Sequence, residues 1–186
     1  MVYVSSDAVY DENASLVTEA SPPGASSYHG LMHLLRERML IQTVVAPLAI
    51  LRPSALYGAG DTHNGYGPNR FLRSALERRQ IALFGGGEEK RDHLHIADFV
   101  HVVDRVIKHR SKGVINVASG TAVTFRKVAE TVRRLVGADV AIRASERTMP
   151  ITHRHFDTAA LIKAVPEFRP RALDEGLRLM ITATTG

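Results

Sequence analysis

The chain has 186 residues, a formal net charge of +5 and no cysteine. This length suits one domain with a sizeable core. The 45 % of hydrophobic and 23 % of charged residues exclude disordered, collagen-like and coiled-coil classes. Without cysteine there are no disulfides, thiol nucleophiles or cysteine metal sites. The longest apolar run, TVVAPLAIL, is far shorter than the roughly 20 residues of a membrane span, so we expect a cytoplasmic protein with no membrane partner.

The excess of basic residues raises the question of an anionic partner. No run contains more than two consecutive lysines or arginines, and the basic residues are scattered through segments such as LERRQ and TVRRL. Few aromatic residues stand between them, whereas proteins that bind single strands use such residues to stack bases. We therefore expect solvated helix faces and no nucleic-acid partner.

Hydrophobic segments alternate with amphipathic ones, which predicts an α/β domain with a largely parallel sheet. Residues 1–6, MVYVSS, predict a buried first strand. After a turn-rich connection, Ser26 or Ser27 can cap a helix that runs to about Leu40. The apolar residues of this helix recur at helical spacing and predict its buried side. They are Leu31, Leu34, Leu35 and Met39.

The segment TVVAPLAILRP predicts the next strand, ended by Pro53, and residues 54–69 predict a long glycine-rich loop of functional type. The remaining chain predicts the usual alternation of strands and helices. In order, we expect a helix over 69–79, a strand at 81–84, a turn at 85–90, a strand at 92–96, a helix over 97–109, a strand at 113–119, a helix over 124–137, a strand at 138–143 and helices over 158–164 and 173–181.

Five blocks of sequence carry a family resemblance: YVSSDAVYD, SSYHGLMHLLRE, ILRPSALYGAGD, KRDHLHIADFV and GVINVASG. In this order the chain resembles the later two-thirds of the extended short-chain dehydrogenase/reductase family, specifically the sugar-nucleotide epimerases and dehydratases. The resemblance implies a partial Rossmann-like parallel sheet, its second half, with a small α+β substrate-binding region. Residues 1–57 would form the Rossmann segment and residues 58–186 the mixed region with the remaining strands, as one structural unit.

The resemblance also implies catalytic roles. Ser6 matches the hydroxyl that hydrogen-bonds the sugar oxygen, and Tyr28 matches the acid/base that also contacts the cofactor. A free phenol has a pKa of about 10, so it requires a nearby positive charge to act as a base. The family places a lysine four residues after the tyrosine, whereas this chain has Met32, which carries no charge. The catalytic pair predicted from the resemblance is therefore incomplete.

Further residues are implied to bind cofactor or substrate. The backbone at Pro53 and Ser54 would pass the nicotinamide, and Ala55 stands where the family often has an asparagine that holds substrate phosphate. Arg91 matches the arginine that pairs with the diphosphate, a task suited to a permanently charged planar fork of donors. Arg70 and Arg154 are weaker candidates for substrate phosphate, and an exposed salt-bridging arginine is the alternative role for each.

Alternating histidines, His93 with His95 and His153 with His155, could suggest a metal site. Two residues apart on a strand they share a face, yet no carboxylate or third histidine stands at a diagnostic spacing. We expect no metal.

A dinucleotide site of this family requires a glycine-rich turn after the first strand and a charged residue some 20 positions later. Neither is present in the sequence, and the chain starts where the family's fifth strand would be. We therefore expect an NAD-dependent sugar-nucleotide epimerase/dehydratase-like protein, truncated at its N-terminus and inactive alone. NAD or NADP would serve the full-length family, with a nucleotide sugar as substrate and a homodimer formed through the tyrosine helix. The alternative is a non-catalytic nucleotide-sugar-binding or dimerisation module.

Overall fold

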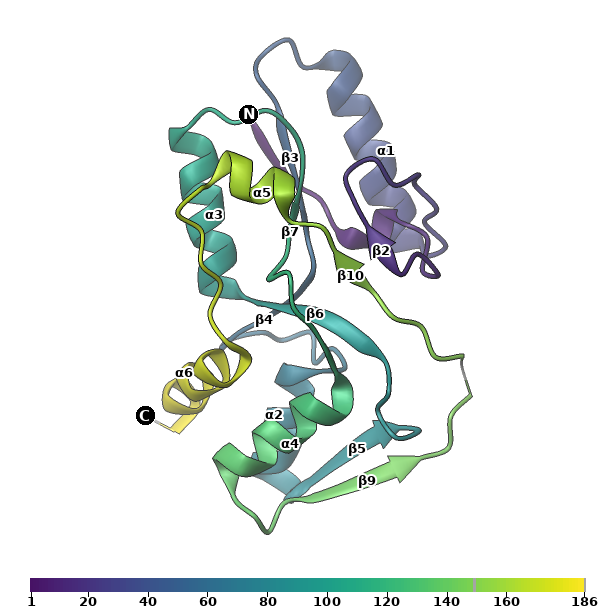
Figure 1. The fold of residues 1–186 in the computed structure, drawn as a ribbon, viewed down its shortest axis with the longest axis vertical. Coiled ribbons are helices and arrows are strands. Elements are labelled where there is room, and N and C mark those ends of the chain that lie inside the picture. Colours follow the sequence, from purple (N-terminus) through teal and green to yellow (C-terminus); the bar gives the residue numbers. More distant parts are fainter. Residues whose placement is uncertain (149, 186) are drawn as a thin grey trace.

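The computed structural model describes residues 1–148 and 150–185. Its central sheet has the parallel strand order β1 (Val2–Val4), β3 (Ala49–Pro53) and β7 (Gly113–Val117). Figure 1 shows these strands side by side in the upper half of the molecule. All five residues of β3 are buried, because it is the central strand. The predicted α/β fold with a Rossmann-like parallel sheet is confirmed.

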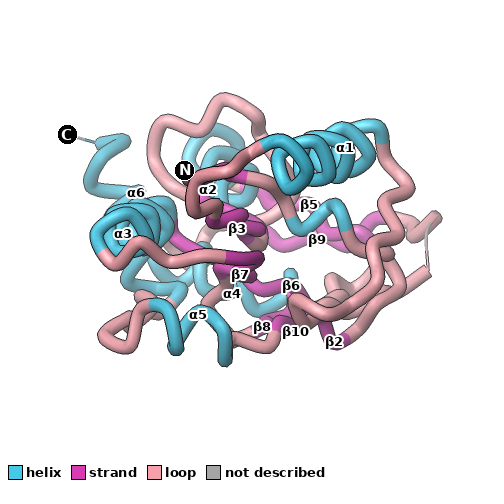
Figure 2. Tube along the Cα trace, turned by 90° about the horizontal axis from the view of Figure 1, so that it is seen from above, coloured by secondary structure: helices cyan, strands magenta, loops and turns pink. Residues whose placement is uncertain are grey.

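Helices cover both faces of this sheet (Figures 1 and 2). Helix α1 (Tyr28–Thr43) lies on one face, and α3 (Ile96–Lys108) and α5 (Ala159–Ala164) lie on the other. Successive side chains of a strand point to opposite faces. On β3, Leu51 therefore joins the apolar core under α3 and α5, while Arg52 faces α1.

The lower half of the molecule in Figure 1 has a second apolar core, formed by three helices and a parallel pair of strands. Helix α4 begins after the side-chain cap of Thr124 and ends at Gly137, as predicted. The elements of this half are α2 (Pro68–Arg78), β5 (Gln80–Phe84), α4 (Phe125–Val136), β9 (Ala141–Ser145) and α6 (Leu173–Thr185).

Short strands connect the two halves. A three-stranded sheet pairs β4 (Ala55–Tyr57) with β6 (Lys90–His95) in parallel and β6 with β8 (Ala122–Thr124) in antiparallel fashion. Elsewhere, β2 (Leu16–Val17) pairs with β10 (His155–Phe156), and the single-turn helix η1 (Asp7–Val9) follows β1. Each predicted helix is present, with bounds close to those expected. Within residues 1–148 and 150–185, no helix combines the length and apolarity needed to cross a bilayer.

Three expectations about strands need correction. The first strand is an edge strand and is not buried, since Val4 is 44 % exposed. The strand predicted from TVVAPLAILRP begins only at Ala49, because α1 continues to Thr43 and the segment containing Pro47 forms the connection. The predicted loop after Pro53 opens with β4, whose backbone pairs with β6.

The expectation for the buried side of α1 is wrong for three of its four residues, while the fourth, Leu34, is partly buried and packs against the apolar cluster that contains Val9. Leu31, Leu35 and Met39 are 47 %, 61 % and 56 % exposed, and the buried residues of this helix are Gly30 and Glu37. Gly30 lies directly against the carbonyl oxygen of Ala8, where a β-carbon would collide with backbone. Apart from Leu34, the inner face of α1 is therefore small and polar, and its other apolar residues face outward.

A buried ion pair holds this polar face against the sheet. Glu37 and Arg52 are 1 % and 8 % exposed. Arg52 donates from Nε to Oε1 of Glu37 at 2.9 Å and from Nη2 to Oε2 at 2.5 Å, and the Ser5 hydroxyl donates to the same carboxylate at 2.5 Å. The Arg52 guanidinium also lies 4.7 Å from the centre of the Tyr10 ring, whose hydroxyl donates to Asn116 at 2.7 Å. One network of hydrogen bonds and charges thus connects α1 with β3, β7 and both ends of the segment from β1 to η1.

We expect the replacement Glu37→Leu to lower the free energy of unfolding by about 3–5 kcal/mol, because it leaves the charge of Arg52 buried without a partner. The double replacement Glu37→Leu with Arg52→Met should recover much of this loss. Urea denaturation of both variants measures the difference. Asp139→Asn, which breaks the exposed pair with Arg79, is the control and should change stability little. Equal losses from the exposed and the buried pair would contradict this prediction.

Candidate active site

A cavity of about 590 Å³ opens beyond the carboxyl ends of β1 and β3, which is where ligands bind in open α/β sheets. Its walls come from the β1–η1 segment, the first two turns of α1, the turn after β3, the segment between β4 and α2, and β6. Its polar lining residues include Ser5, Ser6, Asp7, His29, His33, Ser54, Asp61, Asn69 and His93. Segments far apart in the sequence therefore meet around one space.

Ser6 and Asp7 lie at one wall of the cavity. The Ser6 hydroxyl caps η1 by accepting a hydrogen bond from the Ala8 N–H at 3.1 Å. The Asp7 carboxylate lies 3.3 Å from Arg154. Burial raises the pKa of Asp7, and the charge and hydrogen bonds of Arg154 oppose this rise without cancelling it. Asp7 is thus a partly desolvated carboxyl beside the serine.

The turn after β3 brings Pro53, Ser54 and Ala55 to the opposite wall. Ser54 is held by two bonds: its N–H donates to Val117 at 3.0 Å, and its hydroxyl donates to Asp92 at 3.0 Å. Asp92 also accepts the Ser119 N–H at 2.8 Å. The backbone of this turn is therefore fixed from behind, and its front faces the cavity.

Helix α1 presents different residues to the cavity from those expected. Tyr28, its first residue, is 88 % exposed, and Met32 is 52 % exposed. Neither side chain is among those that line the cavity, while His29 and His33 are. The His29 and His33 rings meet edge to face with centres 4.6 Å apart, and His33 Nδ1 lies 3.0 Å from the Tyr3 hydroxyl. The structure brings Ser6 together with two histidines and leaves Tyr28 outside.

The predicted phosphate-binding arginines lie away from this cavity lining. Arg91 donates to the Thr152 carbonyl at 2.6 Å and to its hydroxyl at 2.8 Å. Arg70 is exposed on α2. Arg154, by contrast, is 7 % exposed and clasps the η1 segment through Asp7 and the Asp11 carbonyl at 2.6 Å. It is a structural arginine that also sets the environment of Asp7.

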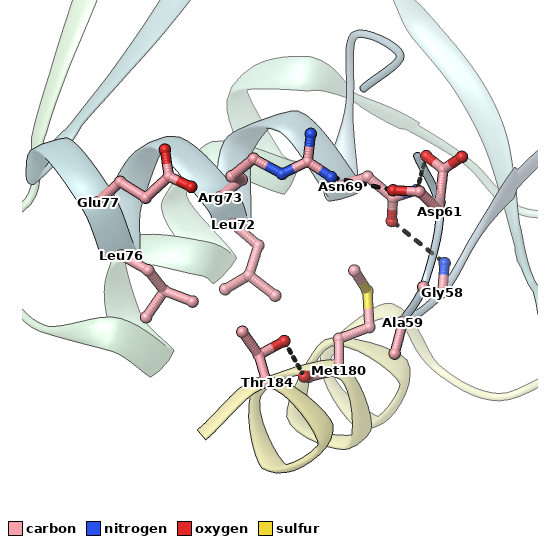
Figure 3. A pocket seen from close by; sticks show the side chains of 11 residues that line it. Gly58, Ala59, Asp61, Asn69, Leu72, Arg73, Leu76, Glu77, Met180 and Thr184 are labelled. Carbon is pink, nitrogen blue, oxygen red and sulfur yellow. Dashed lines mark hydrogen bonds between the residues drawn. The ribbon is translucent and has the colours of Figure 1, made fainter. Parts of the chain in front are cut away.

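A second, smaller recess of about 200 Å³ lies beside the segment between β4 and α2 (Figure 3). At its rim the Asn69 side chain accepts the Gly58 N–H at 3.1 Å and donates to the Asp61 carboxylate, while Arg73 donates to the Asp61 carbonyl at 2.9 Å. Leu72 and Met180 supply its apolar floor. Because Asp61 and Asn69 also line the large cavity, this recess supports one wall of the candidate site.

His93 is a buried imidazole at the back of the cavity, 7 % exposed. It packs against Phe125, with ring centres 5.6 Å apart. Within residues 1–148 and 150–185, neither ring nitrogen has a hydrogen-bond partner. Burial, reinforced by the charge of Arg91, lowers the pKa of His93 from 6.5 to about 4. The ring is therefore neutral at physiological pH. No cluster of three or more metal-binding side chains occurs among the described residues.

His93 should make stability depend on pH. Its folded-state pKa lies below its unfolded value, so the unfolded chain binds the extra proton and stability falls as the pH drops from about 6.5 to about 4. With about 1.4 kcal/mol per pKa unit, we expect His93→Phe to remove roughly 3 kcal/mol of this loss. Denaturation midpoints of both proteins at pH 7 and pH 4.5 measure it. The same loss in both proteins would contradict the prediction, and His101→Gln serves as control.

The sequence of the chain matches a family model. The match covers residues 1–118, and the model describes the NAD dependent epimerase/dehydratase family. The chain belongs to this family. The predicted family resemblance is thereby confirmed, and the matched region contains every wall of the cavity described above.

Individual relatives are distant. The chain is 23 % identical over 151 residues to the uncharacterized UDP-glucose epimerase YtcB of Bacillus subtilis, covering 78 % of this chain and 48 % of that protein. It is 27 % identical over 135 residues to dTDP-4-dehydro-6-deoxy-D-allose reductase of Streptomyces bikiniensis, covering 69 % and 40 %. Among solved structures it resembles MoeE5 in complex with UDP-glucose and NAD, with a TM-score of 0.85, 24 % identity and coverage of 99 % and 64 %. The chain therefore spans less than half the length of these two curated relatives.

Asp7, His29 and His33 are among the cavity-lining residues that sequence reasoning did not assign to the site. A signal was available for the histidines. Residues 29, 33 and 37 are spaced by four, so they follow one side of a helix. A glutamate on that side, with an arginine in the following strand, could have identified it as the inner side.

Proposed function

We propose that this chain supplies the sugar-binding part of an NAD-dependent sugar-nucleotide epimerase or dehydratase. The observation that carries the proposal is the shared cavity of Ser6 and the Pro53–Ala55 turn beyond the strand ends, in a chain of this family. In the proposed reaction Ser6 directs the hydroxyl of the sugar that is oxidised. The turn after β3 forms the wall for the nicotinamide.

The residues present fit the nicotinamide end of a cofactor. The turn at Pro53 and Ser54 is rigid, since both polar groups of Ser54 are bonded behind it, and β1 offers an outer edge that pairs with no other described strand. When bound, the nicotinamide would accept and return a hydride. The glycine-rich loop between β4 and α2 does not have the G-x-G-x-x-G spacing of a dinucleotide-binding turn, and the sequence contains this motif nowhere else. We therefore propose that the chain alone binds NAD or NADP weakly and transfers hydride slowly.

A nucleotide sugar is the proposed substrate. Partly buried carboxyl and hydroxyl groups at the η1 wall suit hydrogen bonds to sugar hydroxyls. Arg91 and Arg154 do not line the cavity, but their positive charges act on Asp7 in this wall. This charge supports, as part of the proposal, a role for Arg91 toward the diphosphate. It would require Arg91 to release Thr152.

We expect calorimetry to detect binding of UDP-glucose or another nucleotide sugar that is stronger than the binding of NAD. Ser6→Ala should weaken the binding of the sugar nucleotide by about fivefold, the equivalent of one hydrogen bond of about 1 kcal/mol, and leave the binding of free UDP unchanged. Ser111→Ala, before the opposite end of β7, is the control. Binding of NAD with no response to any nucleotide sugar would contradict the proposal. Full turnover by the chain alone would contradict its proposed weak activity.

A homodimer through α1 is also proposed, because a specific surface favours it. The outward stripe of α1 consists of Leu31, Met32, Leu35 and Met39, each about half exposed. Apolar side chains at this spacing form one continuous side of the helix, and a contiguous apolar patch on a protein surface is typical of an interface. Two copies that pair this stripe by a twofold axis would bury it on both sides.

We expect light scattering to show a dimer that Leu35→Glu converts to a monomer, because the replacement places a charge in the centre of the apolar contact. Ile107→Glu is the matched control, since Ile107 is similarly exposed at 58 % but lies on α3. A wild-type monomer at high concentration, or equal effects of both variants, would contradict the dimer.

A further inference from the structure

One side of α1 is directed at the cavity, and it carries His29, His33 and Glu37. Residues four apart in a helix differ by only about 40° around its axis. Glu37 is anchored to Arg52 and Ser5, and Ser5 also lines the cavity. This anchor fixes the rotation of the helix, so the two residues one and two turns earlier on the same side reach the cavity. Both histidines do line it.

Tyr28 and Met32 belong to the other side. Each precedes a histidine by one residue, a rotation of about 100°. Tyr28 is 88 % exposed and Met32 is 52 % exposed. They continue the outward stripe that begins at the helix start and runs through Leu35. A rotation of α1 that turned Tyr28 inward would carry Glu37 away from Arg52 and leave both charges without their partner.

We propose that His29 is the proton acceptor in the oxidation step and that His33 positions it, in place of Tyr28 and the residue at position 32. This inference rests on the proposed function and assigns its acid/base group. His33 is fixed by its contact with the Tyr3 hydroxyl at 3.0 Å and holds the His29 ring by an edge-to-face contact. Both histidines and Ser6 line the same cavity.

The chemistry of imidazole accounts for the missing lysine. A phenol requires a cationic neighbour to lose its proton near neutral pH, whereas a neutral imidazole already has one ring nitrogen without a proton that can accept one. An uncharged Met32 is then no defect, because the acid/base group requires no lysine. Burial and the neighbouring His29 and Arg36 lower the pKa of His33 against the charge of Glu37, which keeps the positioning ring neutral.

In the proposed step, a proton and a hydride leave the sugar for different acceptors. The hydroxyl proton of the sugar moves to the unprotonated ring nitrogen of His29, which becomes an imidazolium. A bound oxidised nicotinamide would supply the acceptor for the hydride that leaves the same sugar carbon with its electron pair. The alcohol becomes a carbonyl, and Ser6 hydrogen-bonds its oxygen. In the return step His29 gives the proton back to the oxygen as hydride returns to carbon.

The test uses the full chain labelled with carbon-13 at the Cε1 atoms of its nine histidines and at its tyrosine rings. His29→Gln and His33→Gln assign the two signals. On addition of UDP-glucose together with NAD, we expect the His29 and His33 signals to shift, while the signal of His101 on α3 stays in place. Shifts at the Tyr28 ring or at His93 without shifts at His29 would overturn the inference and leave the proposed function standing. No shift with any nucleotide sugar would overturn the proposed function itself.

A second readout is single-turnover formation of reduced nicotinamide. His29→Gln should lower the rate by about 10²–10⁴-fold, the usual contribution of a general base. The double replacement of His29→Tyr with His33→Lys should recover most of this loss, because it installs the phenol and its cationic partner one turn apart on the inner side. The matched control His101→Gln should retain the wild-type rate. The inference would be overturned if Tyr28→Phe lowered the rate by about 10²–10⁴-fold while His29→Gln left the rate unchanged.

Discussion

The salt bridge between Glu37 and Arg52 determines how this molecule presents its chemistry. Both side chains are almost fully buried, so each charge depends on the other for the stabilisation that water would otherwise provide. Burial alone would lower the pKa of Arg52, but its bonds to Glu37 and Tyr10 outweigh that effect and raise it, so the guanidinium stays charged. Geometry follows from this pairing, because a helix tied to a strand at one buried point has a fixed rotation and a fixed height on the sheet.

The candidate site depends on that fixed helix and on two supported walls. Ser5 links the end of β1 to the same carboxylate, so the serine beside it, Ser6, and the first turns of α1 are held by one group. The turn after β3 is bonded from behind to β7 and to Asp92. The segment before α2 is held through Asn69. Ser5, Ser54 and Asn69 line the cavity, but the groups that hold them do not: their partners are Glu37, Val117, Asp92 and Gly58.

Much of this arrangement could be predicted from the sequence, where local rules were sufficient. Strand ends and turn residues placed Ser6 and Pro53 at the same edge of a parallel sheet, because carboxyl ends of parallel strands meet there. The caps at Ser27, Thr124 and Gly137 set helix ends through bonds to nearby backbone.

The orientation of α1 could not be predicted in this way. The spacing of Leu31, Leu35 and Met39 predicts one apolar side of a helix but does not tell whether the core or a partner covers it. The sequence alone also does not show that Glu37 is buried, because its partner Arg52 belongs to another element. Arg91 likewise matched a phosphate-binding position, but its neighbour Thr152 lies 61 residues further along the chain, beyond any local rule.

Gly30 has a consequence for how this site can change. It lies between the two histidine positions and the wall that carries Ser6, with its bare α-carbon pressed on the backbone at Ala8. The spacing between the helix and the serine segment is therefore set by main-chain contact and is independent of the side chains that face the hollow. Side chains of different size and chemistry can therefore replace one another at position 29 without changing the distance between α1 and the segment that carries Ser6. A single methyl group at position 30 would instead push the helix and this segment apart.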